Sequence, residues 1–192
     1  MTSDAGAIVY RPAAPQDADM IAALHADSWR HNYRGAYADS YLDGDVLGDR
    51  RVVWAARLAT DAANRRTIVA ESAGRIAGLA HVVLDDHPVW GALLDNLHVA
   101  HDRKRQGIGA QLMDRVARTV VQARPSSRLF LWVLEQNRSA QAFYESLGGR
   151  CVERELVQPP EGDPSRLTGT PAGLRYVWSD PALLIRPGAA HA

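Results

Sequence analysis

Apolar residues recur along the first half of the chain at two spacings, one typical of helices and one typical of strands. Residues 7–13 read as a short strand, and Pro15 opens a helical segment that ends near residues 31–35. A second helix is predicted over about 48–63. It is followed by two strands, 67–72 and 75–85, which the turn residues between them join as a hairpin.

The second half alternates strands and helices. A strand over 92–99 precedes a glycine-containing stretch, and the next helix is marked by Ile108, Leu112, Val116 and Val120. A buried strand over 128–135 follows, so residues 92–135 form a strand, helix and strand whose two strands can lie parallel. A further helix carries Phe143 and Tyr144, and strands are expected at 150–157 and 174–178 with a long polar loop between them.

Composition narrows the class of protein. With 192 residues, 46% of them hydrophobic, the chain fits one globular domain over 1–180, and we expect 181–192 to be a loose tail. Its 22 basic side chains balance 22 acidic ones, which argues against nucleic acid or membrane as a partner. The single cysteine and an N-terminus unlike a signal peptide favour a cytoplasmic protein. We expect no metal site.

The stretch "RKRQGIGAQLMDRV", residues 103–116, carries two glycines directly before a helix. The first amides of a helix have no partner within it, and the helix dipole adds partial positive charge there. Because Gly107 and Gly109 lack side chains, a phosphate can approach the backbone, with Lys104 and Arg105 at the rim. The motif lacks the ending of a P-loop, and a structural turn is the alternative.

A second stretch, "LWVLEQNRSAQAFYESLGG", favours the phosphate-binding interpretation. Together the two stretches resemble the GNAT superfamily of acetyl-CoA-dependent N-acetyltransferases. The family's phosphate loop is matched at Lys104, Gly107 and Gly109, with Lys104 a conservative departure. Its later element is matched at Asn137, Ala140, Phe143, Tyr144 and Gly148. Gly149 departs from the phenylalanine frequent in the family.

The resemblance implies an α/β fold with a mixed sheet. That sheet would be mostly antiparallel, contain the parallel strand-helix-strand unit, and have helices on both faces. It also implies acetyl-CoA as cosubstrate, bound by the strand residues Leu97, His98 and Val99, by the loop residues Lys104, Arg105, Gln106, Gly107, Ile108, Gly109 and Ala110, and by Asn137 and Tyr144.

The implied chemistry is direct acetyl transfer to a primary amine of a small molecule or a protein. By resemblance, Tyr144 protonates the departing thiolate, although core packing is its alternative role. Asp95 is the candidate base, since alternation puts it on the face of Leu97 and opposite His98. A solvated carboxylate at Asp95 and a packed histidine at His98 are the alternatives, and Glu135 is a reserve candidate. Asn137 can also cap its helix.

The acceptor side is weakly encoded. Trp29, Tyr33 and Tyr37 form either an aromatic wall of the amine site or part of the core, and residues 158–173 either cover the cleft or form a surface loop. A non-catalytic acyl-CoA-binding or regulatory module is the alternative function. A homodimer, the identity of the amine and the acyl-chain preference stay open.

Overall fold

The chain folds around one mixed sheet of seven strands in the order β1-β2-β3-β4-β5-β7-β6. The computed structural model describes residues 6–60 and 62–187. The strands are β1 (Val9–Pro12), β2 (Arg65–Ser72), β3 (Arg75–His87), β4 (Gly91–Val99), β5 (Leu129–Leu134), β6 (Arg150–Leu156) and β7 (Ala172–Trp178). The pair β4–β5 is parallel, whereas the other neighbouring strands run antiparallel.

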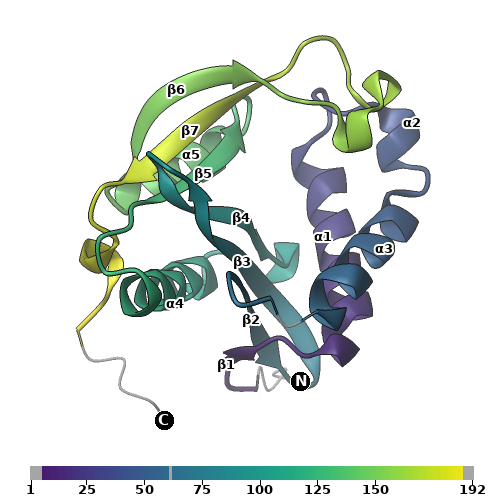
Figure 1. Cartoon of the computed structure of the whole chain (residues 1–192). Helices are drawn as coiled ribbons and strands as arrows, with labels where there is room; N and C mark the ends of the chain where they lie inside the picture. Colours follow the sequence, from purple (N-terminus) through teal and green to yellow (C-terminus); the bar gives the residue numbers. More distant parts are fainter. Residues whose placement is uncertain (1–5, 61, 188–192) are drawn as a thin grey trace.

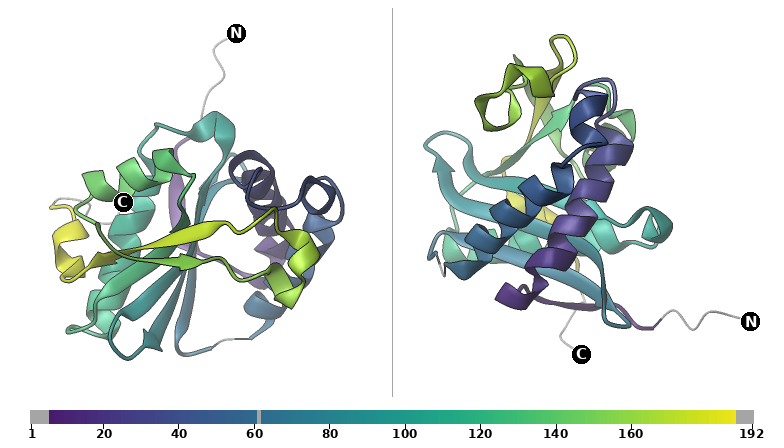
Figure 2. Two further views of the ribbon diagram at one scale, coloured as in Figure 1. Left: turned by 90° about the horizontal axis from the view of Figure 1, so that it is seen from above. Right: turned by 90° about the vertical axis from the view of Figure 1, so that its right-hand side faces the viewer.

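Helices cover both faces of this sheet (Figures 1 and 2). The α-helices are α1 (Ala18–Asn32), α2 (Asp39–Leu42), α3 (Val46–Ala59), α4 (Ile108–Ala123) and α5 (Arg138–Ser146). Helices α1 and α3 pack together over one face, and α4 and α5 lie on the other. This arrangement confirms the predicted fold class, including the parallel unit in which α4 connects β4 to β5.

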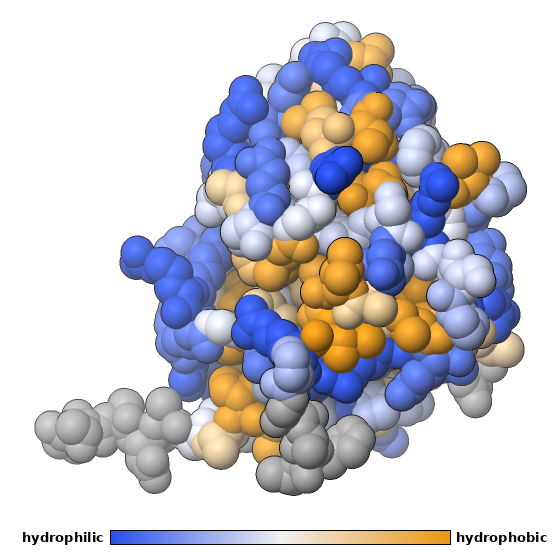
Figure 3. Space-filling view, turned by 90° about the vertical axis from the view of Figure 1, so that its left-hand side faces the viewer, coloured by the Kyte–Doolittle hydropathy of each residue, from blue (hydrophilic) through white to orange (hydrophobic). Residues whose placement is uncertain are grey.

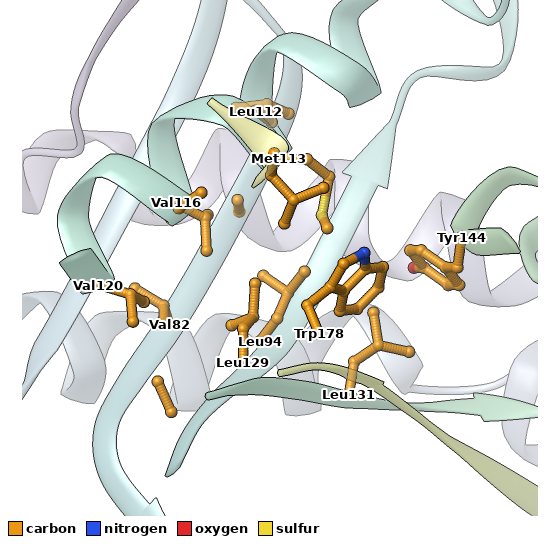
Figure 4. Packing of buried hydrophobic residues seen from close by; sticks show 14 of the residues in the cluster. Val82, Leu94, Leu112, Met113, Val116, Val120, Leu129, Leu131, Tyr144 and Trp178 are labelled. Carbon is orange, nitrogen blue, oxygen red and sulfur yellow. The ribbon is translucent and has the colours of Figure 1, made fainter. Parts of the chain in front are cut away.

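The main hydrophobic core lies between α4 and the sheet. Helical spacing places Leu112, Val116 and Val120 on the buried side of α4, where none of them is exposed. They face strand residues such as Val82 and Leu94, and Figure 4 shows this packing continuing past Trp178 to Tyr144 on α5. The core therefore holds α4 and α5 against the sheet and fixes the position of their N-terminal ends relative to it.

The structure differs from the sequence-based prediction at two helices, one in its boundaries and one in its presence. The second helix begins at Val46, because the Asp45 carboxylate caps it by accepting a hydrogen bond from the amide of Gly48 at 3.2 Å, and it ends at Ala59. The single-turn helix α2 was not predicted, since one turn carries no periodic signal.

The expectation of a loose tail from residue 181 is wrong for the part that the structure describes. Pro181–Leu184 forms a 3-10 helix, η5, whose Leu184 is buried in the core beside α4. The backbone amide of Arg186 also donates to Asp114 of α4 at 2.7 Å. Leu183, the neighbour of Leu184, is 84% exposed. Figure 3 shows apolar residues gathered in the middle of the face that lies on the left of Figure 1. Residues 188–192 lie outside the described residues.

Gly149, which departs from the family pattern, lies where another side chain already fills the space. A β-carbon at this position would come within 2.6 Å of Trp178 Cζ2 and 2.9 Å of the carbonyl oxygen of Tyr144. The indole of Trp178 therefore takes up the volume behind α5 and donates to the carbonyl of Leu147 at 2.9 Å. Only glycine fits at position 149 without displacing that indole.

Candidate functional site

A cleft opens in the sheet where β4 and β5 separate. The two strands pair at Ala92 with Leu129 and at Leu93 with Phe130, and they diverge beyond these positions. The space between them has a volume of about 410 Å³ and is closed by the starts of α4 and α5 and by one side of α1. Its lining includes Asp95, Leu97, His98, Val99, Lys104, Arg105, Gly107, Ile108, Gly109, Ala110, Asn137, Tyr144 and Tyr33. Gln106 and Trp29 are not part of this lining.

A β-bulge at Asp95 changes which face each residue of β4 presents. His81 of β3 lies opposite Asn96, whereas the next residue, Val82, lies opposite Leu94, so Asp95 is the extra residue of β4. The expectation from simple alternation is therefore wrong. Leu97 packs in the core beside α4, but Asp95 points to the other face and forms an ion pair with Arg57 of α3 at 2.7 Å.

Several backbone amides at the start of α4 have no hydrogen-bond partner among the described residues. Gly107 caps the helix with a φ of +80°, and Arg105 is also in the left-handed region at +62°. Within the described part of the chain, the amides of residues 105–110 donate no hydrogen bond to protein, and the first turn of α4 carries no acidic residue. With Lys104 at the rim, this geometry suits an anion such as phosphate. The side chain of Gln106 instead lies 3.4 Å from the carbonyl of Asp102.

Helix α5 presents Tyr144 to the cleft from the opposite wall. Asn137 caps this helix by accepting from the amide of Ala140 at 3.1 Å, as predicted, and it also lines the cleft. The Tyr144 ring packs beside Trp178 and Tyr176, and the residue is only 8% exposed. Its hydroxyl has no hydrogen-bond partner among residues 6–60 and 62–187. Burial raises the pKa of Tyr144, so the phenol keeps its proton at neutral pH.

A chain of hydrogen bonds crosses the α1 side of the cleft. Asn96 donates to Asp95 at 2.6 Å, its carbonyl oxygen lies 3.3 Å from Nε2 of His98, and Nδ1 of His98 lies 2.8 Å from the hydroxyl of Ser28 on α1. Asn32, one turn along α1, donates to the same hydroxyl at 3.2 Å. Ser28, Asn32 and Asn96 all line the cleft and were not predicted. The partners Ser28 and His98 lie 70 positions apart, a separation at which no local pattern indicates contact.

The aromatic residues of α1 and of the segment after it divide between core and cleft. Trp29 is 9% exposed and packs among Tyr33, Tyr37 and Tyr41, with the guanidinium of Arg50 4.4 Å from the centre of its ring. Only Tyr33 of this group lines the cleft, and burial raises its pKa. The core alternative thus fits Trp29, whereas Tyr33 is placed to contact a ligand.

The remaining candidates lie outside the cleft. Glu135 forms an exposed ion pair with Arg154 at 2.8 Å. The loop after β6 packs on the segment between α1 and α2, where Leu167 bridges to Tyr37 and the amide of Thr168 donates to Ala36 at 2.9 Å. Figure 1 shows this loop beside α2, and its residues are absent from the lining of the cleft.

Residues 6–60 and 62–187 contain no group of three or more His, Cys, Asp or Glu side chains placed to hold a metal ion. None of the helices in this part of the chain combines the length and the apolar character needed to span a bilayer.

Comparison with known proteins identifies the family. A model described as the acetyltransferase (GNAT) family matches residues 19–149. The Mycobacterium tuberculosis protein named Probable N-acetyltransferase Rv2775 is 31% identical over 141 residues, which are 72% of this chain and 77% of that protein. The Uncharacterized N-acetyltransferase YuaI of Bacillus subtilis is 27% identical over 77% of this chain and 83% of its own length.

A solved structure supports the same fold. The PaiA N-acetyltransferase of Thermoplasma acidophilum, crystallised with coenzyme A, superimposes with a TM-score of 0.66 at 15% identity. The match covers 90% of this chain and 99% of that one. Together with the match to the family model over most of its length, this places the chain in the GNAT family of acetyltransferases.

Proposed function

We propose that the protein transfers the acetyl group of acetyl-CoA directly to a primary amine bound in the cleft between β4 and β5. The observation that carries this proposal is the run of backbone amides at residues 105–110, which have no hydrogen-bond partner among the described residues; apart from Gln106, these residues line the same cleft as Tyr144. A donor-rich helix start suits the pyrophosphate of the coenzyme, and a buried phenol suits its sulfur.

The cleft can hold an extended coenzyme arm. Beyond Leu93, the edge of β4 that faces β5 has lost its neighbouring strand, so the backbone groups of residues 97–99 are available to an amide-containing ligand. The pantetheine arm carries two such amides. Its pyrophosphate then reaches Lys104 and the start of α4, while its sulfur lies toward Tyr144.

Tyr144 is the proposed general acid. A thiolate leaves more readily if it is protonated as the C–S bond breaks, and a phenol with a raised pKa is fully protonated at the start of the reaction. The hydroxyl has no partner among the described residues that would compete for its proton. Loss of such an acid typically lowers turnover by about 100-fold or more.

The acceptor amine is proposed to enter from the side of α1. There the cleft is lined by Ser28, Asn32 and Tyr33, and Asp95 supplies a negative charge at its margin. This end is polar and aromatic, which suits an ammonium or amine group. An amine on a small molecule or on a protein would satisfy the same contacts.

Calorimetry with acetyl-CoA tests the donor half of the proposal. We expect measurable heat and a rise in melting temperature, because a ligand that binds the native state alone stabilises it by mass action. A panel of amines with detection of free thiol tests the acceptor half. Binding without thiol release from any amine would instead favour a non-catalytic acyl-CoA-binding module, and absence of binding at millimolar coenzyme would refute both.

A further inference from the structure

We infer that Ser28 accepts the proton of the attacking amine and that His98, oriented by Asn96, relays it away from the reaction. This inference rests on the proposed acetyl transfer, for which it assigns the base. It replaces Asp95 as the group in contact with the amine and leaves that carboxylate a positioning role.

The hydrogen-bond partners fix the direction of every donor in the chain. Because Asp95 accepts only, the amide nitrogen of Asn96 must face it, and the carbonyl oxygen of Asn96 must face His98. Nε2 of His98 is therefore the protonated ring nitrogen. In a neutral ring Nδ1 is then an acceptor, so the hydroxyl of Ser28 donates to it at 2.8 Å.

With its proton directed to His98, the oxygen of Ser28 has two lone pairs, and the donation from Asn32 leaves one of them free to accept a proton. Asn32 donates to this oxygen at 3.2 Å, which helps to fix its position. A serine hydroxyl that donates to a histidine, which a third group orients, is an arrangement able to take up a proton. Here the third group is Asn96, and Ser28 is the member of the chain that α1 contributes to the cleft lining.

Asp95 is poorly placed to act as the base itself. Its Oδ2 atom lies 2.7 Å from a guanidinium nitrogen of Arg57 and 2.6 Å from the amide nitrogen of Asn96. The first contact is an ion pair and the second is a hydrogen bond, and both lie on the sheet face toward α1 and α3, to which the bulge turns this side chain. The carboxylate therefore holds Asn96 in the orientation that the relay needs.

The surroundings keep His98 neutral at rest. Burial lowers the pKa of His98 to about 4, and the negative charge of Asp95 opposes this shift only partly. The ring centre of His25, on α1, lies 4.5 Å from that of His98, and Arg57 of α3 forms an ion pair with Asp95. An unprotonated Nδ1 is thus available throughout the neutral pH range, and the charge of Asp95 stabilises the imidazolium that forms transiently.

The amine nitrogen attacks the thioester carbonyl carbon, so that a C–N bond forms and the C–S bond breaks. The proton of the nitrogen passes to Ser28 as the proton of Ser28 passes to Nδ1 of His98. The electron pair of the C–S bond goes to sulfur, which takes the proton of Tyr144. His98 is left as imidazolium and Tyr144 as phenolate, and both return to their resting states through solvent.

Removal of one hydroxyl tests the relay. In Ser28→Ala we expect kcat to fall by about 100-fold with acetyl-CoA affinity unchanged. Ser28→Thr keeps a hydroxyl and should retain most of the turnover. His98→Gln should show a similar loss, and the double variant should be no slower than either single one, because members of one relay are not additive.

A matched control lies on the same face of the sheet. The hydroxyl of Thr67 is 2.7 Å from Nδ1 of His81, and burial, with Arg57, lowers the pKa of His81 to about 4 as well. This pair does not line the cleft. Thr67→Val removes a similar hydrogen bond and should leave kcat unchanged.

The pH dependence separates a relay from a structural role. Without Ser28 the proton must pass to water or hydroxide, so the deficit of Ser28→Ala relative to wild type should shrink as the pH rises from about 7 to 9. A kcat for Ser28→Ala within twofold of wild type, or a deficit that does not change with pH, would overturn the relay alone. If the wild-type protein acetylates no amine in the panel, the proposed function fails, and the relay fails with it.

Discussion

Changing Tyr144 to phenylalanine separates chemistry from packing at the cleft, because it removes one oxygen and keeps the ring. The ring contributes to the core beside Trp178, whereas the hydroxyl has no partner among the described residues. No protein hydrogen bond is therefore lost in the variant. We expect the free energy of unfolding to change by less than about 1 kcal/mol, which is about 2–4 °C in melting temperature for a chain of this size.

Turnover should respond very differently. Loss of a positioned acid predicts a fall in kcat of about 100-fold or more, equivalent to about 2.7 kcal/mol in activation free energy. Acetyl-CoA affinity should stay nearly constant, since the amides at the start of α4 are untouched.

A neighbouring tyrosine provides the control with the opposite expectation. The ring centre of Tyr176 lies 6.1 Å from that of Tyr144, and its hydroxyl donates to the carboxylate of Glu145 at 2.7 Å. Tyr176→Phe removes this charge-assisted bond, at a cost of about 1.5 kcal/mol or about 3–6 °C, with kcat near wild type.

Steady-state kinetics with one accepted amine, together with thermal melts, measures both effects. The acid assignment is wrong if Tyr144→Phe keeps kcat within threefold of wild type. It is also wrong if Tyr144→Phe lowers the melting temperature more than Tyr176→Phe does, because the phenol would then be structural.

Three further substitutions test other parts of the structure. In Gly107→Ala the new β-carbon meets no neighbouring atom, but the alanine must adopt a φ of +80°. We therefore expect about 1 kcal/mol of destabilisation and weaker acetyl-CoA binding by calorimetry. If the affinity for acetyl-CoA is unchanged, Gly107 serves only as a structural turn. Gly149→Ala places a β-carbon 2.6 Å from Trp178, and urea denaturation should show a loss of about 1–3 kcal/mol with an unchanged m-value. Arg11 donates to Asp17 at 2.6 Å and 2.9 Å and lowers its pKa, so Asp17→Asn should cost about 2 kcal/mol at pH 7. The pKa of Asp17 is lower in the folded state than its unfolded value of about 4, so the stabilisation is present above about pH 4 and is lost as the pH falls through the folded pKa. A difference in stability between wild type and Asp17→Asn that stays undiminished at pH 2 would contradict this assignment.

Local patterns were sufficient for most of the fold. The helical spacing from Ile108 to Val120 and the apolar run of β5 are each contained within one element, so they predicted the parallel unit around α4. The order of the other elements followed in the same way. The glycines before α4 and the motif on α5 indicated where two walls of the cleft begin.

The third wall of the cleft depends on contacts that no single segment encodes. The bulge at Asp95 arises from the pairing of β4 with β3, and it reverses the face that period-two alternation predicts. The contact between Ser28 and His98 joins α1 to β4 across 70 positions. A sequence motif shows which residue types a site contains. The direction in which a polar side chain points depends on the neighbouring strand or helix, which the motif does not include.

The separation of β4 from β5 also has a mechanical meaning. The sheet consists of two plates, one formed by β1–β4 and the other by β5, β7 and β6, and the two pairs of residues at Ala92 and Leu93 act as their seam. A ligand that lies in the gap stands in place of an eighth strand and ties the plates together beyond that seam. Occupancy of the cleft and rigidity of the sheet are then linked, and hydrogen exchange along the open edge of β4 would report on the ligand even if it never reacts.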